Sequence, residues 1–403
     1  MAKIAIIIQR YGLEINGGAE YHARMLAEQL TVEHDVTVLT SKAKDYHSWT
    51  DTYDQEEELL NGVQVKRFSA LPKNQKKFRK LRRKVLRTRL IDKLLGRKNT
   101  VTEVPIATGH QFVKEQGPYC PGLLQYLKEQ QSGYDVFIFF TYLYAPTVFG
   151  LPLVKDKSIF VPTAHDEPLL YTAAYRQLFD TPRYIMYNTL AERELIEKNF
   201  PNACKKQAIA GMGIQPYTLP TTQPVTNQWV SGDYFVYIGR IDNDKGCGEL
   251  IEYFHRLRRE NLSLVLIGNN ENYQSQITSE NIVFTGFISE AEKYALLNNA
   301  KGLIIPSKYE SLSLVTLESM LQGKLVIANS YCKVLKDHIE QSKAGLLYEN
   351  YEGFAAAIEK VISLSTLDYE LLAANGISYV ENNYSWPSIL AKFNKAIDHI
   401  KNS

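Results

Sequence analysis

Short apolar runs alternate with longer segments of helical periodicity along the whole chain. Short apolar runs bounded by polar loops are typical of strands buried on both faces of a parallel sheet. Apolar runs predict strands at 3–8, 35–39, 63–68, 136–140, 158–162, 183–187 and 207–210 and, later, at 234–238, 262–267, 282–284, 303–306, 324–326 and 345–347. The pattern predicts an α/β protein.

Apolar residues at helical spacing fill most of the intervals between these strands. Helices are expected at 17–30, 123–131, 191–198, 249–259, 290–300 and 313–322. A strand, a helix and a further strand imply parallel pairing through a right-handed crossover. Because this pattern stops and then restarts near Tyr234, we expect two doubly wound domains.

The composition changes between the two halves. Residues 211–232 are rich in Gly, Pro and Thr, which indicates a connector. A chain of 403 residues is comfortable for two domains, each with its own core. We therefore expect a first domain at 1–210, a linker at 211–232 and a second domain at 233–384.

Composition indicates an ordinary soluble globular protein, with 45% hydrophobic and 22% charged residues. The four cysteines show no C-x-x-C spacing, so neither a zinc site nor a disulfide framework is indicated. The first apolar run is too short for a signal peptide or a membrane span. A cytoplasmic location is expected.

Basic residues are concentrated at 73–98. Thirteen lysines and arginines against the single Asp92 give this stretch a net charge of +12, so the rest of the chain, whose total is +2, carries −10. Apolar side chains recur among the charges near helical spacing: Phe78, Leu81, Val85, Leu86, Leu90, Leu94 and Leu95. Such a basic amphipathic helix favours contact with an anionic bilayer.

Three alternatives to membrane contact stay open for residues 73–98. The helix can fold against its own domain with a solvated charged face, or a partner protein can cover it. A nucleic-acid patch is less favoured, because no aromatic stacking platform accompanies the charge.

Residues 303–326 carry the strongest candidate chemistry. Glu310 precedes a helix expected to begin near Ser313, and Glu318 lies inside that helix. The N–H groups at a helix start suit a diphosphate, while carboxylates suit hydroxyls, so this arrangement predicts a nucleotide-sugar site. The alternative is that Ser311 or Ser313 only caps the helix and Glu318 is solvated.

Two glycine-containing loops add candidate phosphate contacts. Gly17 and Gly18 follow the first strand at a helix entry, and the 239–246 loop holds Arg240 and Lys245 between glycines. A dehydrogenase is disfavoured, because no G-x-G-x-x-G is present and no acid ends the second strand. The D-x-D at 242–244 invites a metal, but two neighbouring cations suffice to neutralise a diphosphate, so no metal is expected.

His165 and Asp166 follow the end of the 158–162 strand, where open α/β sheets hold their ligands. A histidine at this position is a candidate for facing the ligand. It can equally serve to fix the loop together with Asp166.

Four motifs occur in one order: Gly17-Gly18-Ala19-Glu20, Gly239-Arg240-x4-Lys245-Gly246, Thr285-Gly286-Phe287 and Glu310-x7-Glu318. The ordered set resembles the retaining GT-B glycosyltransferases of family 4, among the glycosyl transferases group 1. The resemblance implies two Rossmann-like domains facing across a cleft. It also implies a last helix at 385–403 that crosses back to the first domain, and metal-independent transfer with no cofactor besides the nucleotide-sugar substrate.

The resemblance also implies roles for individual residues. Catalytic roles fall on His165, Arg240, Lys245 and Glu310. Donor binding falls on Gly17, Gly18, Gly239, Arg240, Lys245, Gly286, Phe287, Glu310, Ser313, Leu314, Val315 and Glu318. Within these sets, Arg240 and Lys245 hold the diphosphate, Glu310 binds the sugar, Glu318 the ribose, and the backbone near Phe287 meets the base.

The chain departs from the family pattern twice. The E-x-F-G-L entry reads Glu310-Ser311-Leu312-Ser313-Leu314, and the small Gly-Gly turn after the next strand is replaced by residues 331–334. The expected function is transfer of a hexose or deoxyhexose to a glycan or lipid-linked glycan in cell-surface polysaccharide synthesis. UDP-sugars are weakly preferred over GDP- and dTDP-sugars. The alternative is an inactive paralogue that binds or stabilises another transferase.

Overall fold

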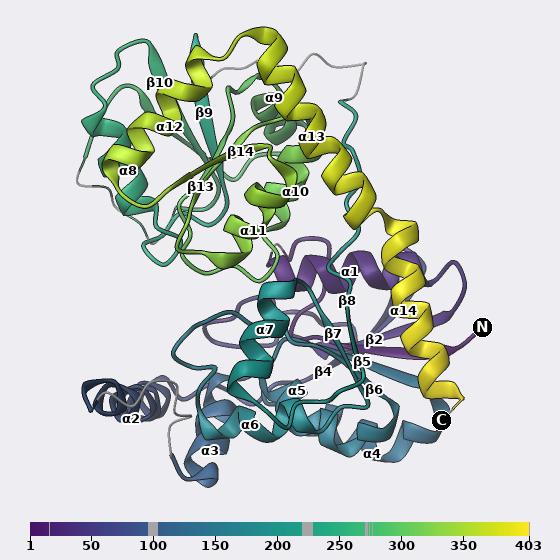
Figure 1. Ribbon diagram of the computed structural model, residues 1–403. Helices are drawn as coiled ribbons and strands as arrows, with labels where there is room; N and C mark the ends of the chain where they lie inside the picture. Colours follow the sequence, from purple (N-terminus) through teal and green to yellow (C-terminus); the bar gives the residue numbers. More distant parts are fainter. Residues whose placement is uncertain are drawn as a thin grey trace. The chain divides into compact units, whose positions relative to one another are not determined.

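The computed structural model describes residues 1–15, 17–95, 104–219, 229–270, 273, 275 and 277–402. Two compact units make up the chain. The first comprises Met1–Met212 and Ile389–Ser403, and the second Gly213–Ser388 (Figure 1). Each contains a mainly parallel sheet with helices, which confirms the expected pair of doubly wound α/β domains.

The sheet of the first unit has eight strands in the order β3-β4-β2-β1-β5-β6-β7-β8. They are β1 (Lys3–Ile7), β2 (Asp35–Ser41), β3 (Glu57–Leu60), β4 (Val63–Phe68), β5 (Val136–Phe140), β6 (Ser158–Val161), β7 (Tyr184–Tyr187) and β8 (Gln207–Ile209). All pairs are parallel except β3 with β4. Since the order of the chain reverses direction between β1 and β5, the topological switch point lies between them.

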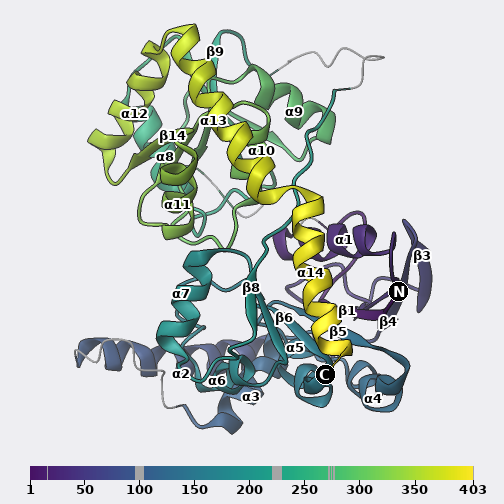
Figure 2. The same ribbon diagram turned by 45° about the vertical axis from the view of Figure 1, so that its right-hand side comes forward.

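Helices cover this sheet on both faces. They are α1 (Gly18–Leu30), α2 (Gln75–Leu94), α3 (Ile106–Gln116), α4 (Pro121–Gln130), α5 (Ala145–Gly150), α6 (Ala173–Asp180) and α7 (Leu190–Asn199), with short 3₁₀ helices η1 (Gln131–Gly133), η2 (Leu151–Leu153) and η3 (Lys155–Lys157). Figures 1 and 2 show α1 on one side of the strands and α4, α5 and α6 on the other.

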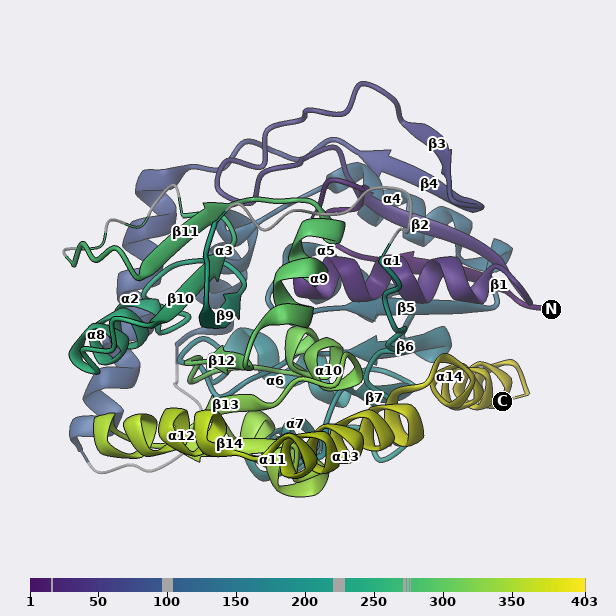
Figure 3. The same ribbon diagram turned by 90° about the horizontal axis from the view of Figure 1, so that it is seen from above.

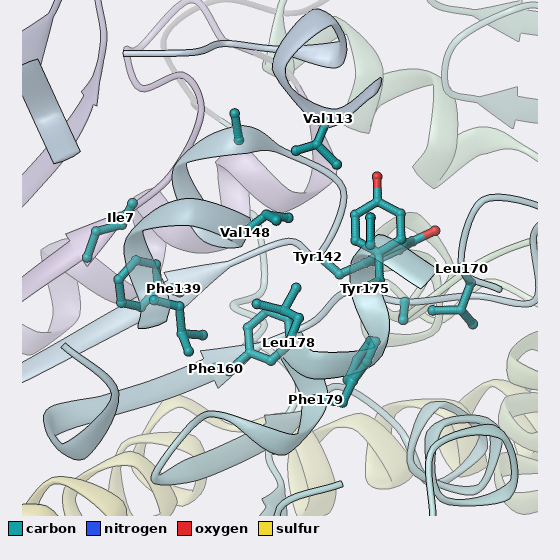
Figure 4. Packing of buried hydrophobic residues seen from close by; sticks show 14 of the residues in the cluster. Ile7, Val113, Phe139, Tyr142, Val148, Phe160, Leu170, Tyr175, Leu178 and Phe179 are labelled. Atoms are coloured by element: carbon teal, nitrogen blue, oxygen red, sulfur yellow. The ribbon is translucent and has the colours of Figure 1, made fainter. Parts of the chain in front are cut away.

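An aromatic-rich core fills the first unit beneath these helices. Figure 4 shows Phe139 of β5 and Phe160 of β6 beside Val148 of α5 and the apolar face of α6, including Phe179. The inward residues of the strands are fully buried, which is why β5 and β6 are continuous apolar runs in the sequence.

The sheet of the second unit is entirely parallel, in the order β11-β10-β9-β12-β13-β14. Its strands are β9 (Asp233–Ile238), β10 (Leu262–Ile267), β11 (Ile282–Gly286), β12 (Leu303–Ile305), β13 (Val326–Asn329) and β14 (Gly345–Tyr348). The helices are α8 (Cys247–Arg256), α9 (Glu290–Asn299), α10 (Leu314–Leu321), α11 (Lys333–Ser342), α12 (Tyr351–Ser363) and α13 (Thr366–Tyr384), and Figure 3 shows α12 and α13 from the side. The switch point lies between β9 and β12.

The last helix, α14 (Trp386–Lys401), passes from one unit to the other. From Ile389 onward its residues group with the first unit, and Ile389, Phe393, Ala396 and Ile397 are fully buried. In the same helix, Asn394 Oδ1 lies 2.9 Å from Nε2 of His34 in the first unit. Of the expected 211–232 linker, residues 220–228 lie outside the described residues, and its first part groups with the second unit from Gly213.

The basic stretch forms α2, and its apolar side chains have a partner inside the first unit. Phe78 stacks on Phe112 of α3 with ring centroids 5.8 Å apart, and Leu81 and Val85 are buried in the core. These three apolar side chains therefore pack within their own unit, which is one of the alternatives that the sequence left open, and α3 was not recognised in the sequence. Contact of α2 with an anionic membrane stays a prediction. Arg97 and Lys98 lie outside the described residues.

The charged face of α2 remains accessible. Exposed basic side chains between its start and Val85 are Lys76, Lys77, Arg79, Lys80, Arg82, Arg83 and Lys84. Leu94 and Leu95 at the end of the helix are exposed as well, Leu94 by 85%. In the part of the chain that the structure describes, no helix is long and apolar enough to cross a membrane.

Candidate functional site

Two predicted site residues meet at the switch point of the second unit. Lys245 lies in the loop after β9, Glu310 lies in the loop after β12, and these two strands are neighbours in the sheet. Lys245 Nζ donates to Glu310 Oε1 at 2.7 Å. The crevice outside the carboxyl ends of strands at a switch point is where open α/β sheets bind ligands. The structure therefore brings the expected phosphate-binding cation and the expected sugar-binding acid together.

The loop between β9 and α8 is held close to the loop after β12. Gly246 caps α8 at a φ of 80°, in the left-handed region. A Cβ at this position would lie 2.8 Å from the carbonyl oxygen of Pro306. Glycine at position 246 thus lets Lys245 approach the loop after β12. The other glycine of this loop, Gly239, directly follows β9.

Asp242 organises both cations of this loop. One of its carboxylate oxygens, Oδ1, accepts the backbone N–H of Lys245 at 2.8 Å, and Oδ2 lies 2.5 Å from Arg240 Nε. From the sequence, Asp242 was considered only as a possible metal ligand within the D-x-D at 242–244. Both of its oxygens are engaged within the loop, and Asp244 is exposed. Among the described residues, no three metal-ligating side chains cluster.

The start of α10 has an unusual backbone. Ser313, its N-cap, has φ 58° and ψ 68°, a left-handed conformation at the position where the resembled motif carries glycine. Its carbonyl accepts the N–H of Thr316 at 3.0 Å, and its hydroxyl lies 2.9 Å from the Thr316 hydroxyl. The N–H groups of Leu314 and Val315 fall in the first helical turn, where intrahelical acceptors are absent. These groups are the candidate phosphate donors.

Glu318 lies in the second turn of α10 and is not a solvated helix residue. Its side chain is 15% exposed, and its Oε2 lies 3.6 Å from Lys293 Nζ of α9. The pKa of the Glu318 carboxyl is raised, because the effect of burial outweighs the opposing effect of the Lys293 charge. The sequence assigned no role to Lys293.

The two remaining segments of the predicted pocket differ in exposure. Gly286 ends β11, and Phe287 directly after it is 72% exposed. Residues 331–334, which replace the expected small turn, become the start of α11, with buried Cys332 as its N-cap. Burial raises the pKa of the Cys332 thiol to about 11, so this thiol is protonated at neutral pH.

In the first unit, the glycines expected at a ligand lie at the start of α1. Gly17 is the N-cap and Gly18 the first helical residue. A Cβ at Gly17 would lie 2.0 Å from Glu20 Oε2. Arg10 holds that carboxylate with two donors, Nε at 3.0 Å and Nη2 at 2.6 Å. The Arg10–Glu20 pair, which the sequence analysis missed, leaves room for glycine alone at position 17.

His165 has a different carboxylate partner from the one its neighbour suggested. Its Nε2 lies 3.5 Å from Glu167 Oε1, which accepts the hydroxyl of Tyr142 at 2.5 Å. Asp166 instead accepts the hydroxyl of Tyr171. The pairing with Glu167 orients the imidazole at the carboxyl end of β6.

A buried acid supports the loop that carries His165. Glu192 of α7 accepts the backbone N–H of Ala164 at 2.5 Å and that of Asn188 at 2.6 Å. Burial raises the pKa of Glu192 to about 8 against the effect of these two donors. Nothing in the local sequence indicates this contact, because Glu192 and Ala164 follow different strands.

Residues 224–377 match the family model described as "Glycosyl transferases group 1". This segment of the second unit is similar to the group 1 glycosyl transferases. The matched segment contains Arg240, Lys245, Glu310 and Glu318, so the switch-point site lies within it. His165, Gly17 and Gly18 lie outside the match.

Curated relatives of the chain match over part of their length. The chain is 28% identical over 180 residues to "Capsular polysaccharide biosynthesis glycosyltransferase CapM" of Staphylococcus aureus, covering 40% of this chain and 46% of that protein. It is 27% identical over 167 residues to "Uncharacterized glycosyltransferase MJ1607" of Methanocaldococcus jannaschii, covering 38% and 42%. These matches span less than half of either relative.

Solved structures resemble both units of the chain. Sucrose-phosphate synthase from Thermosynechococcus elongatus aligns with a TM-score of 0.70 at 17% identity over 99% of both chains. Anabaena HepE in complex with UDP and glucose gives 0.69 at 14% identity over 99% of this chain and 100% of its own. WaaG, a glycosyltransferase involved in lipopolysaccharide biosynthesis, aligns with a TM-score of 0.63 at 14% identity over 99% of this chain and 100% of its own. The likeness shows the GT-B fold, as expected from the sequence.

Proposed function

We propose that the protein is a retaining glycosyltransferase that moves a hexose or deoxyhexose from a nucleoside diphosphate sugar to a glycan or lipid-linked glycan. The observation that carries this proposal is the Lys245–Glu310 pair at the switch point, beside the first turn of α10. A cation, free N–H groups and a carboxylate then stand where a diphosphate and a sugar would bind. The family match supports the same chemistry.

In the proposed reaction, the bond between the anomeric carbon and the β-phosphate oxygen breaks while the acceptor oxygen bonds to that carbon on the same face. Negative charge grows on the departing phosphate. Lys245, Arg240 and the start of α10 stabilise that charge more as the bond breaks, which lowers the barrier. The acceptor proton passes to the leaving phosphate oxygen. No protein nucleophile and no metal enters this scheme.

The donor and acceptor classes are proposals supported by relatives. HepE is known in complex with UDP and glucose and in complex with UDP-glucose, which favours a UDP-sugar over GDP- and dTDP-sugars for this chain. The names of CapM and WaaG concern capsular polysaccharide and lipopolysaccharide biosynthesis. We therefore place the acceptor in cell-surface polysaccharide or glycoconjugate synthesis, with the enzyme on the cytoplasmic face and α2 directed to the anionic membrane.

Lys245→Ala tests the site, with Lys301→Ala as a matched control. Lys301 Nζ lies 3.1 Å from Asp233 Oδ1, so it forms a lysine–carboxylate pair next to the same two strands, at their amino ends. We expect Lys245→Ala to lower kcat/KM by about a hundredfold to a thousandfold, the effect of losing one group that stabilises the transition-state charge. Lys301→Ala should leave it unchanged, and thermal unfolding should report both variants folded.

The same assay separates the proposed mechanism from its alternatives. The anomeric configuration of the product by NMR should match that of the donor, and an inverted product would exclude same-face transfer. Activity should survive EDTA. Slow release of nucleoside diphosphate from the donor without acceptor distinguishes an enzyme from an inactive binding paralogue, which would release none.

A further inference from the structure

Lys293 lies between two acidic side chains in the second unit. From the first turns of α9, its Nζ reaches Glu290 Oε2 at 2.7 Å and Glu318 Oε2 of α10 at 3.6 Å. Its side chain is 14% exposed and its ammonium lies 4.4 Å from the centroid of the Tyr294 ring. A flexible lysine with these contacts is held in one arrangement.

The surroundings of Lys293 are themselves fixed. Ser289 and Glu292 form a capping box that sets the start of α9. The Tyr294 ring stacks on the Tyr217 ring, with centroids 4.2 Å apart and an angle of 4° between the ring planes. The carbonyl of Tyr217 accepts a hydrogen bond from Gln322 Nε2, at the end of α10, at 3.1 Å. Tyr217 therefore connects α9 to α10, and the separation of Lys293 from Glu318 is set by both helices.

A buried carboxylate that has no positive charge nearby takes up a proton more readily than one paired with a cation. Once protonated, it no longer offers both oxygens purely as acceptors. An ionised carboxylate can accept hydrogen bonds from two adjacent hydroxyls at once. Burial raises the pKa of Glu318 above its ordinary value, and of the charged side chains that act on it, Lys293 favours the ionised form and Glu290 opposes it.

We propose that Lys293 is a positioning residue that keeps the Glu318 carboxylate charged and directed to the 2′- and 3′-hydroxyls of the donor's ribose. This inference rests on the proposed function and narrows it. The donor is then a ribonucleoside diphosphate sugar, and nucleotides without a 2′-hydroxyl bind more weakly. Lys293 itself touches neither the diphosphate nor the sugar.

Nucleotide pairs that differ only in the 2′-hydroxyl test the proposal. Calorimetric titration of the full chain with UDP and 2′-deoxy-UDP, and with GDP and 2′-deoxy-GDP, measures the preference for ribose. We expect the wild type to prefer the ribonucleotide by about tenfold, the effect of one hydrogen bond to a charged group. Lys293→Met should abolish that preference, and Lys293→Arg should restore most of it. The affinity for inorganic pyrophosphate should be the same in all three proteins.

The outcomes separate the inference from the function beneath it. If the Lys293→Met variant prefers ribonucleotides as strongly as the wild type does, the inference is overturned and the proposed function is unaffected. A wild type that binds none of the four nucleotides overturns the proposed function instead. A general loss, which includes pyrophosphate, would mark Lys293 as structural and overturn its positioning role. Lys293→Gln removes the charge in a polar side chain of similar reach and gives the same test should the Met variant not fold.

Discussion

At the scale of single residues, the candidate site and the loop that carries His165 contain a backbone conformation and buried acids that are uncommon for the residue types present. Ser313 adopts the left-handed conformation that glycine adopts without strain. Glu318 and Glu192 are acids removed from water. Such departures concentrate at functional sites, where the surrounding structure holds them. Each has a measurable consequence.

The strain at Ser313 predicts an inverted order of stability for two substitutions. Ser313→Gly and Ser313→Ala both remove the hydroxyl that contacts Thr316, so their difference isolates the backbone. At φ 58° the glycine variant should be more stable by about 1 kcal/mol in urea denaturation. The control is Ser378, exposed within α13 (Thr366–Tyr384), where glycine should be less stable than alanine by a similar amount. Equal stabilities at position 313 would argue against a left-handed Ser313.

Glu192 predicts a loss of stability as the pH rises. Its pKa is raised from 4.5 to about 8 in the folded protein, so between these values the folded state binds more protons than the unfolded state. Stability from this group is therefore complete below about pH 4.5 and is lost as the pH rises toward 8. Relative to Glu192→Gln, which cannot ionise, the wild type should lose unfolding free energy between pH 6 and pH 9. A constant difference in urea denaturation across these pH values contradicts the raised pKa.

At the scale of elements, α2 combines a buried face and a charged face that have separate roles. Leu81 and Val85 belong to the core of the first unit, so removal of the whole 73–98 stretch would expose that core as well as remove charge. Only substitutions on the outer face test contact with an anionic surface. The structure therefore changes which experiment is informative.

Neutralising the charged face of α2 should weaken binding to anionic vesicles. With Lys76, Arg79, Lys80 and Arg83 changed to Gln, we expect partitioning onto phosphatidylserine-containing liposomes to fall by about two to three orders of magnitude, at about 1 kcal/mol for each cation. The control changes the exposed Lys128, Lys336, Lys343 and Lys360, an equal loss of charge elsewhere. Equal effects of the two sets in a flotation assay would exclude a specific membrane face on α2.

At the scale of the whole molecule, the chain does not divide at one point. Residues 389–403 end the sequence yet belong to the unit that begins it, where Lys401 Nζ donates to the carbonyl of Met1 at 3.1 Å. The stability of the first unit therefore depends on its most distant residues in sequence. Hydrogen exchange can assign that dependence to one unit.

Phe393→Ala should destabilise the first unit selectively. Phe393 is fully buried in α14, and removing such a side chain costs about 3–5 kcal/mol. Phe354→Ala, at an equally buried position of the second unit, is the control. By mass spectrometry, Phe393→Ala should accelerate hydrogen exchange in β1 (Lys3–Ile7), and Phe354→Ala in β9 (Asp233–Ile238). Faster exchange in β9 alone for Phe393→Ala would contradict the division of the chain.

Local pattern was sufficient for most elements and for the doubly wound class. Apolar runs marked nearly every central strand, because a strand buried on both faces must be apolar along its length. The short edge strand β3 (Glu57–Leu60) was missed, since half of it is acidic and it pairs only with β4. Six helices were missed as well: α3 (Ile106–Gln116), α5 (Ala145–Gly150), α6 (Ala173–Asp180), α11 (Lys333–Ser342), α12 (Tyr351–Ser363) and α13 (Thr366–Tyr384). Without α3, contact with a bilayer was favoured for the apolar face of α2 over packing within its own unit.

The sequence by itself determined which residue types stand at the end of each strand, because the partition of side chains between water and core sets the elements. Only the tertiary structure decided which of these residues meet. Lys245 and Glu310 are 65 positions apart and touch because β12 returns beside β9. Lys293 and Glu318 likewise lie on helices that follow different strands. Such contacts depend on strand order and helix packing, which no local pattern encodes.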